Sequence, residues 1–159
     1  MKDLLRFIVS LVWTCSFWVH SAEVHQHAAK EIGDMPVPQI AVSVTRDAVD
    51  GVNVNLQLSN YALGPPESEI ECASVLQGHA HLFINGKRVM RLYAQSLHIP
   101  SHLLEGKINQ IAVSLNSHQH ENWIVNDQTV VASVFIDTSK EALVLHSFSS
   151  QPLSLAKTQ

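Results

Sequence analysis

Two histidines separated by one residue, on a predicted strand, have the chemistry of a binding site. His79 and His81 lie in residues 79–84, whose apolar and aromatic content predicts a strand. Alternate residues of a strand face the same side, roughly 6–7 Å apart, so both imidazoles can reach one ion about 2 Å from each nitrogen. Neutral imidazole binds copper and zinc, so the spacing predicts a metal site. The alternative is a polar strand face that binds nothing.

A predicted tight turn adds a thioether to this pair. Asn85-Gly86 follows the strand directly, and Asn-Gly between apolar runs indicates a two-residue hairpin, because a type I′ turn needs positive φ at both central residues. Counting outward from the turn places Met90 opposite His81, on the same face. Two imidazoles beside a thioether favour copper over magnesium or calcium. We therefore expect a copper ion, with zinc as the alternative, and Met90 as a candidate ligand.

Further ligands are expected from segments that a β-sandwich gathers at one end. His120 belongs to another His-x-His group with His118, in a polar loop that follows a predicted strand. His98 lies two residues before Pro100, in a predicted connection. We predict His120 as the third ligand, and His98 or Met90 as the next candidates. No carboxylate pattern accompanies them, which disfavours calcium.

Short strands must position these side chains. Residues 40–45 and 52–59 alternate apolar with polar residues around a turn cluster, which predicts a hairpin. Four further apolar runs are predicted strands: residues 79–84, 87–93, 108–115 and 129–136, with a shorter one at 123–125. About seven short strands separated by turn signals, with no amphipathic helix, predict an all-β, two-sheet sandwich of the immunoglobulin or cupredoxin type.

The beginning of the chain has the pattern of a secretion signal. Lys2 and Arg6 precede an uncharged stretch at residues 7–19, and small residues follow it. The stretch is shorter than the roughly 20 apolar residues that cross a bilayer. We expect a cleaved signal peptide and a periplasmic or secreted protein; the alternative is an uncleaved anchor helix. The predicted divisions are a signal peptide at 1–21, a flexible lead at 22–38, a β-sandwich domain at 39–137, and a C-terminal tail at 138–159 in which residues 142–146 could add an edge strand.

The composition limits the classes of partner that this protein is expected to bind. The chain has 10 Lys and Arg against 14 Asp and Glu; loss of residues 1–21 removes Lys2, Arg6 and Asp3, which leaves 8 against 13, a net charge of −5. Nucleic acids and anionic membranes attract clustered cations, so we expect neither as a partner, and no membrane insertion after signal cleavage. Cys72 would be the only cysteine left, which rules out an intramolecular disulfide. A buried thiol, an intermolecular bridge and a metal ligand stay open for it.

Several motifs resemble a family of small exported bacterial β-sandwich proteins. They are Gly78-His79-Ala80-His81-Leu82-Phe83-Ile84-Asn85-Gly86-Lys87, Arg91-Leu92-Tyr93, His98, Leu115-Asn116 and His120. The resemblance covers roughly residues 40–136 and implies an extracytoplasmic, metal-handling domain. It places His79, His81, His98 and His120 on the family's histidine positions. The chain departs from the pattern at residues 117–119, where the family has Ala-Asn-Asp, and at Ala94 and Leu97.

These observations predict an extracytoplasmic metal-binding protein that buffers or delivers copper. The alternative is a non-catalytic sandwich module that binds another protein of the cell envelope. An enzyme is not expected, because the sequence has no nucleophile elbow, no His-Glu-x-x-His and no glycine-rich phosphate loop.

Overall fold

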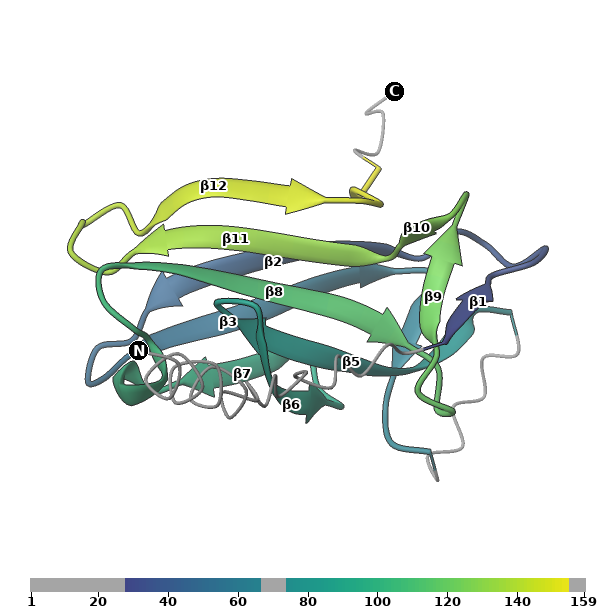
Figure 1. The fold of residues 1–159 in the computed structure, drawn as a ribbon, viewed down its shortest axis with the longest axis horizontal. Coiled ribbons are helices and arrows are strands. Elements are labelled where there is room, and N and C mark those ends of the chain that lie inside the picture. The colour runs from purple at the N-terminus through teal and green to yellow at the C-terminus, as the bar shows by residue number, and fades with distance from the viewer. Residues whose placement is uncertain (1–27, 67–73, 155–159) are drawn as a thin grey trace, which may run out of the picture.

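The computed structural model describes residues 28–66 and 74–154, and these form an all-β structure (Figure 1). Its strands are β1 (Ala29–Glu31), β2 (Gln39–Arg46), β3 (Val52–Ser59), β4 (Tyr61–Leu63), β5 (Leu76–Ile84), β6 (Lys87–Leu92), β7 (Ser96–Ile99), β8 (Ile108–Asn116), β9 (Asn122–Val125), β10 (Gln128–Thr129), β11 (Val131–Asp137) and β12 (Val144–Ser149). The one helical segment in the described residues is a 3₁₀ turn, Ser101–Leu103. Twelve strands thus replace the seven predicted, because several are too short to show a sequence period.

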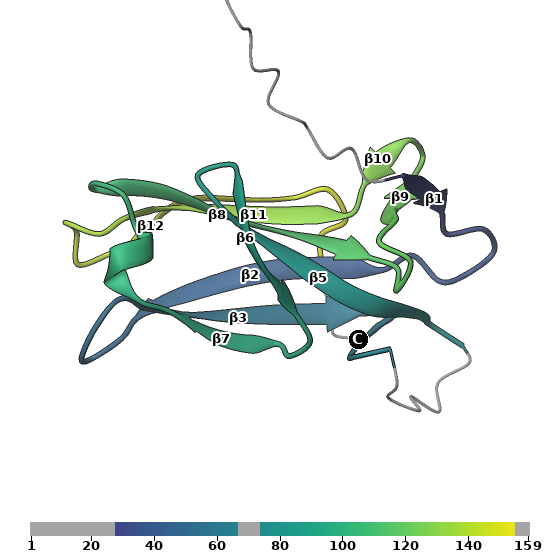
Figure 2. The same ribbon diagram turned by 60° about the horizontal axis from the view of Figure 1, so that its bottom comes forward.

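The strands form two sheets that pack against each other, which confirms the predicted sandwich (Figure 2). The small sheet has the order β2-β3-β7. In the large sheet β8 lies between β5 and β11, β6 extends it beyond β5, and β12 extends it beyond β11. Strands β1, β9 and β10 form an extension at the end of β8, and β4 pairs with β5.

Alternation along the strands places the core between the sheets. In β3, Val52, Val54 and Leu56 are buried while the intervening residues are exposed, so the predicted hairpin with β2 is confirmed. Burial of such apolar side chains is the main stabilising term of the fold. The centre of the core comprises Ile40, Val54, Leu82, Val113 and Val134, each at most 1 % exposed.

Two segments outside the predicted domain belong to the sandwich. Ala29–Glu31 pairs in parallel with β9, so the predicted flexible lead is wrong at these residues. β12 confirms the expected edge strand but covers Val144–Ser149, and the N–H of Ile40 donates to the carbonyl of Gln151 beyond it. The domain therefore extends past residue 137, because these pairings satisfy backbone groups of β2 and β11.

Some predictions lie outside the described residues. They concern the signal peptide at residues 1–21, the first part of the lead, and Cys72. Within the part of the chain that the structure describes, no helix is long and apolar enough to cross a membrane.

The predicted Asn-Gly hairpin is present between β5 and β6. Asn85 and Gly86 have φ of 51° and 78°, as a type I′ turn requires. Ile84 pairs with Lys87 and Phe83 with Arg88, as counted from the turn. Beyond Phe83 a β-bulge shifts the register, and this shift affects the candidate site.

Candidate metal centre

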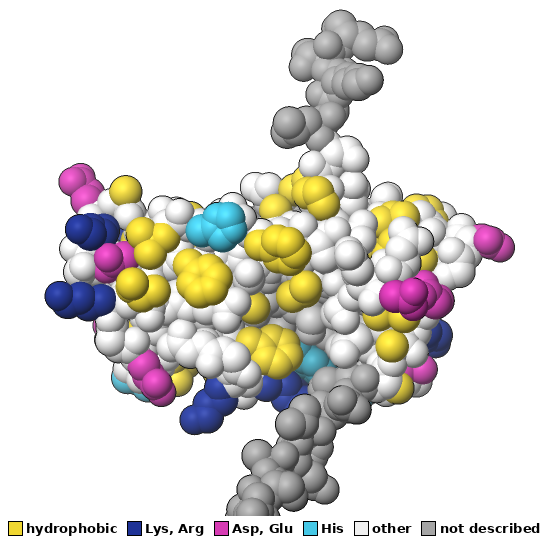
Figure 3. Space-filling view, turned by 45° about the horizontal axis from the view of Figure 1, so that its top comes forward, with side chains coloured by type: hydrophobic (Ala, Val, Ile, Leu, Met, Phe, Trp, Pro, Cys, Tyr) yellow, Lys and Arg dark blue, Asp and Glu magenta, His cyan; other side chains and the backbone are white. Residues whose placement is uncertain are grey.

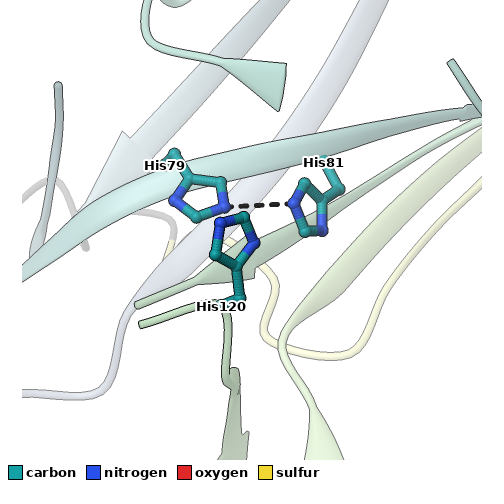
Figure 4. Close-up of side chains that lie close together, drawn as sticks. All are labelled: His79, His81 and His120. Carbon is teal, nitrogen blue, oxygen red and sulfur yellow. Dashed lines mark hydrogen bonds between the residues drawn. The ribbon is translucent and has the colours of Figure 1, made fainter. Parts of the chain in front are cut away.

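Three histidines from two elements converge on the outer face of the large sheet (Figure 4). His79 and His81 come from β5, and His120 comes from the loop between β8 and β9. Their candidate ligand nitrogens all lie within 4.8 Å of one another. Three side chains that can bind a metal thus lie together in this part of the described structure, and they can hold one ion.

The distance between the two strand histidines suits a shared ion. The Nε2 atoms of His79 and His81 lie 3.0 Å apart and form a hydrogen bond whose direction depends on the tautomers. Two nitrogens that bind one tetrahedral zinc at about 2.0–2.1 Å are about 3.3 Å apart. An ion can therefore replace the shared proton with little movement of the rings.

Strand alternation explains why both rings point out of the core. Ala80 and Leu82 face the small sheet, so His79 and His81 face the other side. Both are nonetheless buried, at 1 % and 0 % exposed. Since an outward-facing side chain is not covered by the core, other elements must cover this face. His120 supplies part of that cover, because its ring centroid lies 4.8 Å from that of His79 and 5.8 Å from that of His81.

The loop that carries His120 is held by a compact set of hydrogen bonds. The backbone N–H of His120 donates to Ser117, and the N–H of Ser117 donates to the carbonyl of Glu121. The Ser117 hydroxyl donates to the Glu121 carboxylate at 2.8 Å, and Lys30 of β1 pairs with the same carboxylate at 3.2 Å. These two contacts, the Ser117 hydroxyl first, lower the pKa of Glu121. The N-terminal strand thus helps to fix the histidine loop.

His120 itself has a left-handed backbone conformation, with φ of 69°. Few residues other than glycine adopt this region, although histidine is among those enriched there. Such a conformation persists where the surroundings impose it, and it often occurs at functional sites. The His120 imidazole points toward His79 and His81 (Figure 4).

A buried tyrosine and a glycine set the backbone beneath the site. The Tyr61 hydroxyl lies 2.9 Å from the carbonyl oxygen of His79 and 2.8 Å from that of Asn116, so it can donate to either. Burial raises the pKa of Tyr61 well above its ordinary value, so this hydroxyl keeps its proton. A Cβ on Gly78 would collide with the Asn116 carbonyl and lie 2.6 Å from the Tyr61 hydroxyl. Only glycine allows this close approach.

Polar side chains of β8 lie beside the histidines. Ser114 pairs with His81 and Asn116 with His79 in the strand register. The Ser114 hydroxyl donates to Asn116, and the Asn116 amide donates to Asn122 at 2.6 Å. This buried chain of hydrogen bonds links β8 to the first residue of β9 and restrains the loop that carries His120.

His98 does not join the cluster. It lies on β7 of the small sheet, paired with Asn53, whose side-chain oxygen is 3.2 Å from its Nδ1. The side chain is exposed on the outer face of that sheet. The prediction of His98 as a ligand therefore fails, because the two outer faces of a sandwich point in opposite directions.

Met90 also lies outside the cluster, and its predicted pairing with His81 is wrong. The β-bulge on the β6 side pairs Met90 with Leu82 and Arg91 with His81. A shift of one residue moves each side chain to the opposite face. Met90 is 40 % exposed and offers no thioether to the site. The donor set is therefore imidazole alone.

Several residues of the site were not assigned a role from the sequence. His118 was visible as half of a His-x-His pair, but its ring centroid lies 6.4 Å from that of His79, outside the ligand group. Tyr61 and Gly78 carry no local signal of their function, because their contacts join strands far apart in the chain.

Comparisons with known proteins found no match: no family model, no curated protein and no solved structure matches the chain. The resemblance to small exported β-sandwich proteins stays a prediction. The chemistry of the site must be argued from its own residues.

Proposed function

We propose that this protein binds one late first-row transition-metal ion through His79, His81 and His120, and buffers or delivers it outside the cytoplasm. The observation that carries the proposal is the convergence of three imidazoles within 4.8 Å, two of them buried. Imidazole ligands suit copper, zinc, nickel and iron, and the general affinity order peaks at Cu(II). Copper is therefore the first candidate and zinc the second.

Transport or storage fits this geometry better than a structural role. A structural zinc site usually has four protein ligands, whereas three leave a coordination position open for exchange. The sandwich also has an apolar core between its sheets, separate from the histidines, and burial of that core stabilises the fold without the ion. The predicted signal peptide supports a place outside the cytoplasm, where the anionic mature chain would be exported.

The decisive experiment compares matched histidines on the two sheets. The protein, purified without a tag, is assayed for bound metal and titrated with Cu(II), Cu(I) and Zn(II). We expect His79→Ala and His81→Ala each to lose at least about tenfold in affinity, about 1.4 kcal/mol. His98→Ala, a strand histidine on the other sheet, should bind as the parent does. His25→Ala tests the lead: if it alone abolished binding, the metal would bind there and the proposal would be wrong.

A second candidate function rests on a different observation. Hydrophobic side chains gather on the surface over β11 and β12 (Figure 3). Phe135, Leu145 and Phe148 are 37 %, 52 % and 54 % exposed. Exposed apolar patches mark interaction surfaces, so an envelope protein that docks here is the alternative function. A protein that binds no metal in the titrations above would favour this second candidate.

A further inference from the structure

His118 lies beside the three-histidine cluster without belonging to it. Its ring is stacked alongside that of His79, with 6.4 Å between the centroids and 29° between the planes. It shares a tight turn with His120, since the N–H of His120 donates to the carbonyl of Ser117. The two loop histidines are therefore tethered to each other, while His79 and His81 are fixed on β5.

The Nδ1 atom of His118 is buried and has no hydrogen-bond partner in the described structure. Buried polar side-chain atoms almost always have a partner, so each exception needs an explanation. Apolar packing does not require an imidazole at this position. A nitrogen that is free to bind an ion for part of the time accounts for it.

Access to the site points to the same residue. His79 and His81 are at most 1 % exposed, so an acceptor cannot reach an ion from their side. His118 and His120 are only partly buried, so they are the histidines of this region that solvent reaches. Tyr93, which is 39 % exposed, also lies beside His79, with 6.0 Å between the ring centroids. Of these partly exposed neighbours, only the two histidines offer a nitrogen that can bind a passing ion.

We propose that His118 is a transfer ligand, through which the metal ion enters and leaves the three-histidine site; this rests on the proposed function above. On release, His120 keeps its bond to the ion, a nitrogen of His118 binds it, and the nitrogens of His79 and His81 let it go. Water or the acceptor's ligands fill the remaining positions. All four imidazoles are neutral ligands, so the ion keeps its oxidation state and no other reactant is needed.

The loop makes this exchange mechanically simple. Its ends are held by the bonds between Ser117 and Glu121, so the backbone need not move. Only rotation of the His118 side chain, which is partly exposed, is then needed to bring its nitrogen toward the ion. A rotating ligand on a fixed backbone can therefore change the rate of metal exchange while leaving the equilibrium affinity nearly unchanged.

The test measures both quantities on the full-length protein loaded with Cu(II). Affinity is obtained by competition, and the transfer rate by stopped-flow mixing with excess EDTA. We expect His118→Ala and the bulkier His118→Gln to slow transfer at least tenfold while changing the affinity less than threefold. His102→Ala, an exposed histidine of the 3₁₀ turn, is the matched control and should change neither.

Two results would overturn the inference. Transfer as fast as in the parent, or faster, would make His118 a packing residue or a gate. A tenfold loss of affinity in both variants would make it a permanent fourth ligand. Failure of the proposed function is seen separately, because the parent protein itself would then bind no Cu(II).

Discussion

The outer faces of both sheets carry strand histidines, but these histidines differ in burial. On the large sheet, β5 presents His79 and His81, and both are buried. On the small sheet, β7 presents His98 beside Asn53 of β3, and both are exposed. The strand pattern is the same in both places. The difference is the loop at residues 117–121, which covers the first pair and adds a third imidazole.

The support beneath the two faces differs as well. On the small sheet, polar side chains bond each other in solvent, as Asn55 does with Ser96 at 2.8 Å. On the large sheet, the Tyr61 hydroxyl and the absent side chain of Gly78 hold β5 close to β8 under the histidines. A histidine on a strand thus becomes a candidate ligand when a second element covers it and the backbone below is fixed.

The largest effect is expected from adding a methyl group beneath the site. Gly78→Ala forces a Cβ into the Asn116 carbonyl, so β5 must move away from β8. Overpacking of this kind costs about 3 kcal/mol, which urea unfolding would measure. The metal affinity should also fall, because the backbone of His79 moves. If this variant kept the stability and metal affinity of the parent, the close approach of β5 to β8 at Gly78 would not be what supports the histidine site.

The turn of the β5–β6 hairpin offers a smaller, purely conformational test. Gly86 has φ of 78° and open space around its Cα, so a side chain there meets strain but no collision. Gly86→Val should lower the unfolding free energy by about 1–2 kcal/mol, since β-branched residues tolerate this region poorly. Gly86→Asn is the control and should cost less, because asparagine adopts positive φ more readily. Equal stability of the valine variant and the parent would contradict the type I′ turn.

The smallest effect concerns the hairpin turn of the small sheet and appears only in acid. The N–H of Val49, the Asn53 amide and the N–H of Asp50 lower the pKa of Asp47 from 3.8 to about 2. Because the folded pKa is depressed, this contribution to stability is present above pH 3.8 and is lost as the pH falls toward about 2. Asp47→Asn keeps an oxygen acceptor but does not titrate.

Thermal unfolding from pH 5 to pH 2 checks this prediction. Between pH 3.8 and about pH 2, the melting temperature of the variant should change less with pH than that of the parent. Its metal affinity at pH 7 should be the same. A pH dependence identical to that of the parent would show that the turn does not perturb Asp47. A change in the metal affinity of Asp47→Asn would mean that the turn of the small sheet influences the histidine site on the large sheet, contrary to our expectation.

Much of the site was predictable because its signals are local. The alternation of residues 52–59, the Asn85-Gly86 turn and the shared face of His79 and His81 follow from backbone periodicity and turn geometry. His120 was predicted from its loop, and the structure brings it to the pair. The registry of Met90 was not predictable by counting, because a single bulge changed the face of each later residue in β6.

The sequence by itself determined that two imidazoles would share one side of a rigid strand, because that is a property of extended backbone. Tertiary structure decided that this side would be covered, that His98 would lie on the other sheet while His120 completed the group, and that β1 would join the large sheet. Each of these depends on pairing between segments far apart in the chain. No local pattern encodes such pairing, since its free energy comes from surfaces that meet only in the folded molecule.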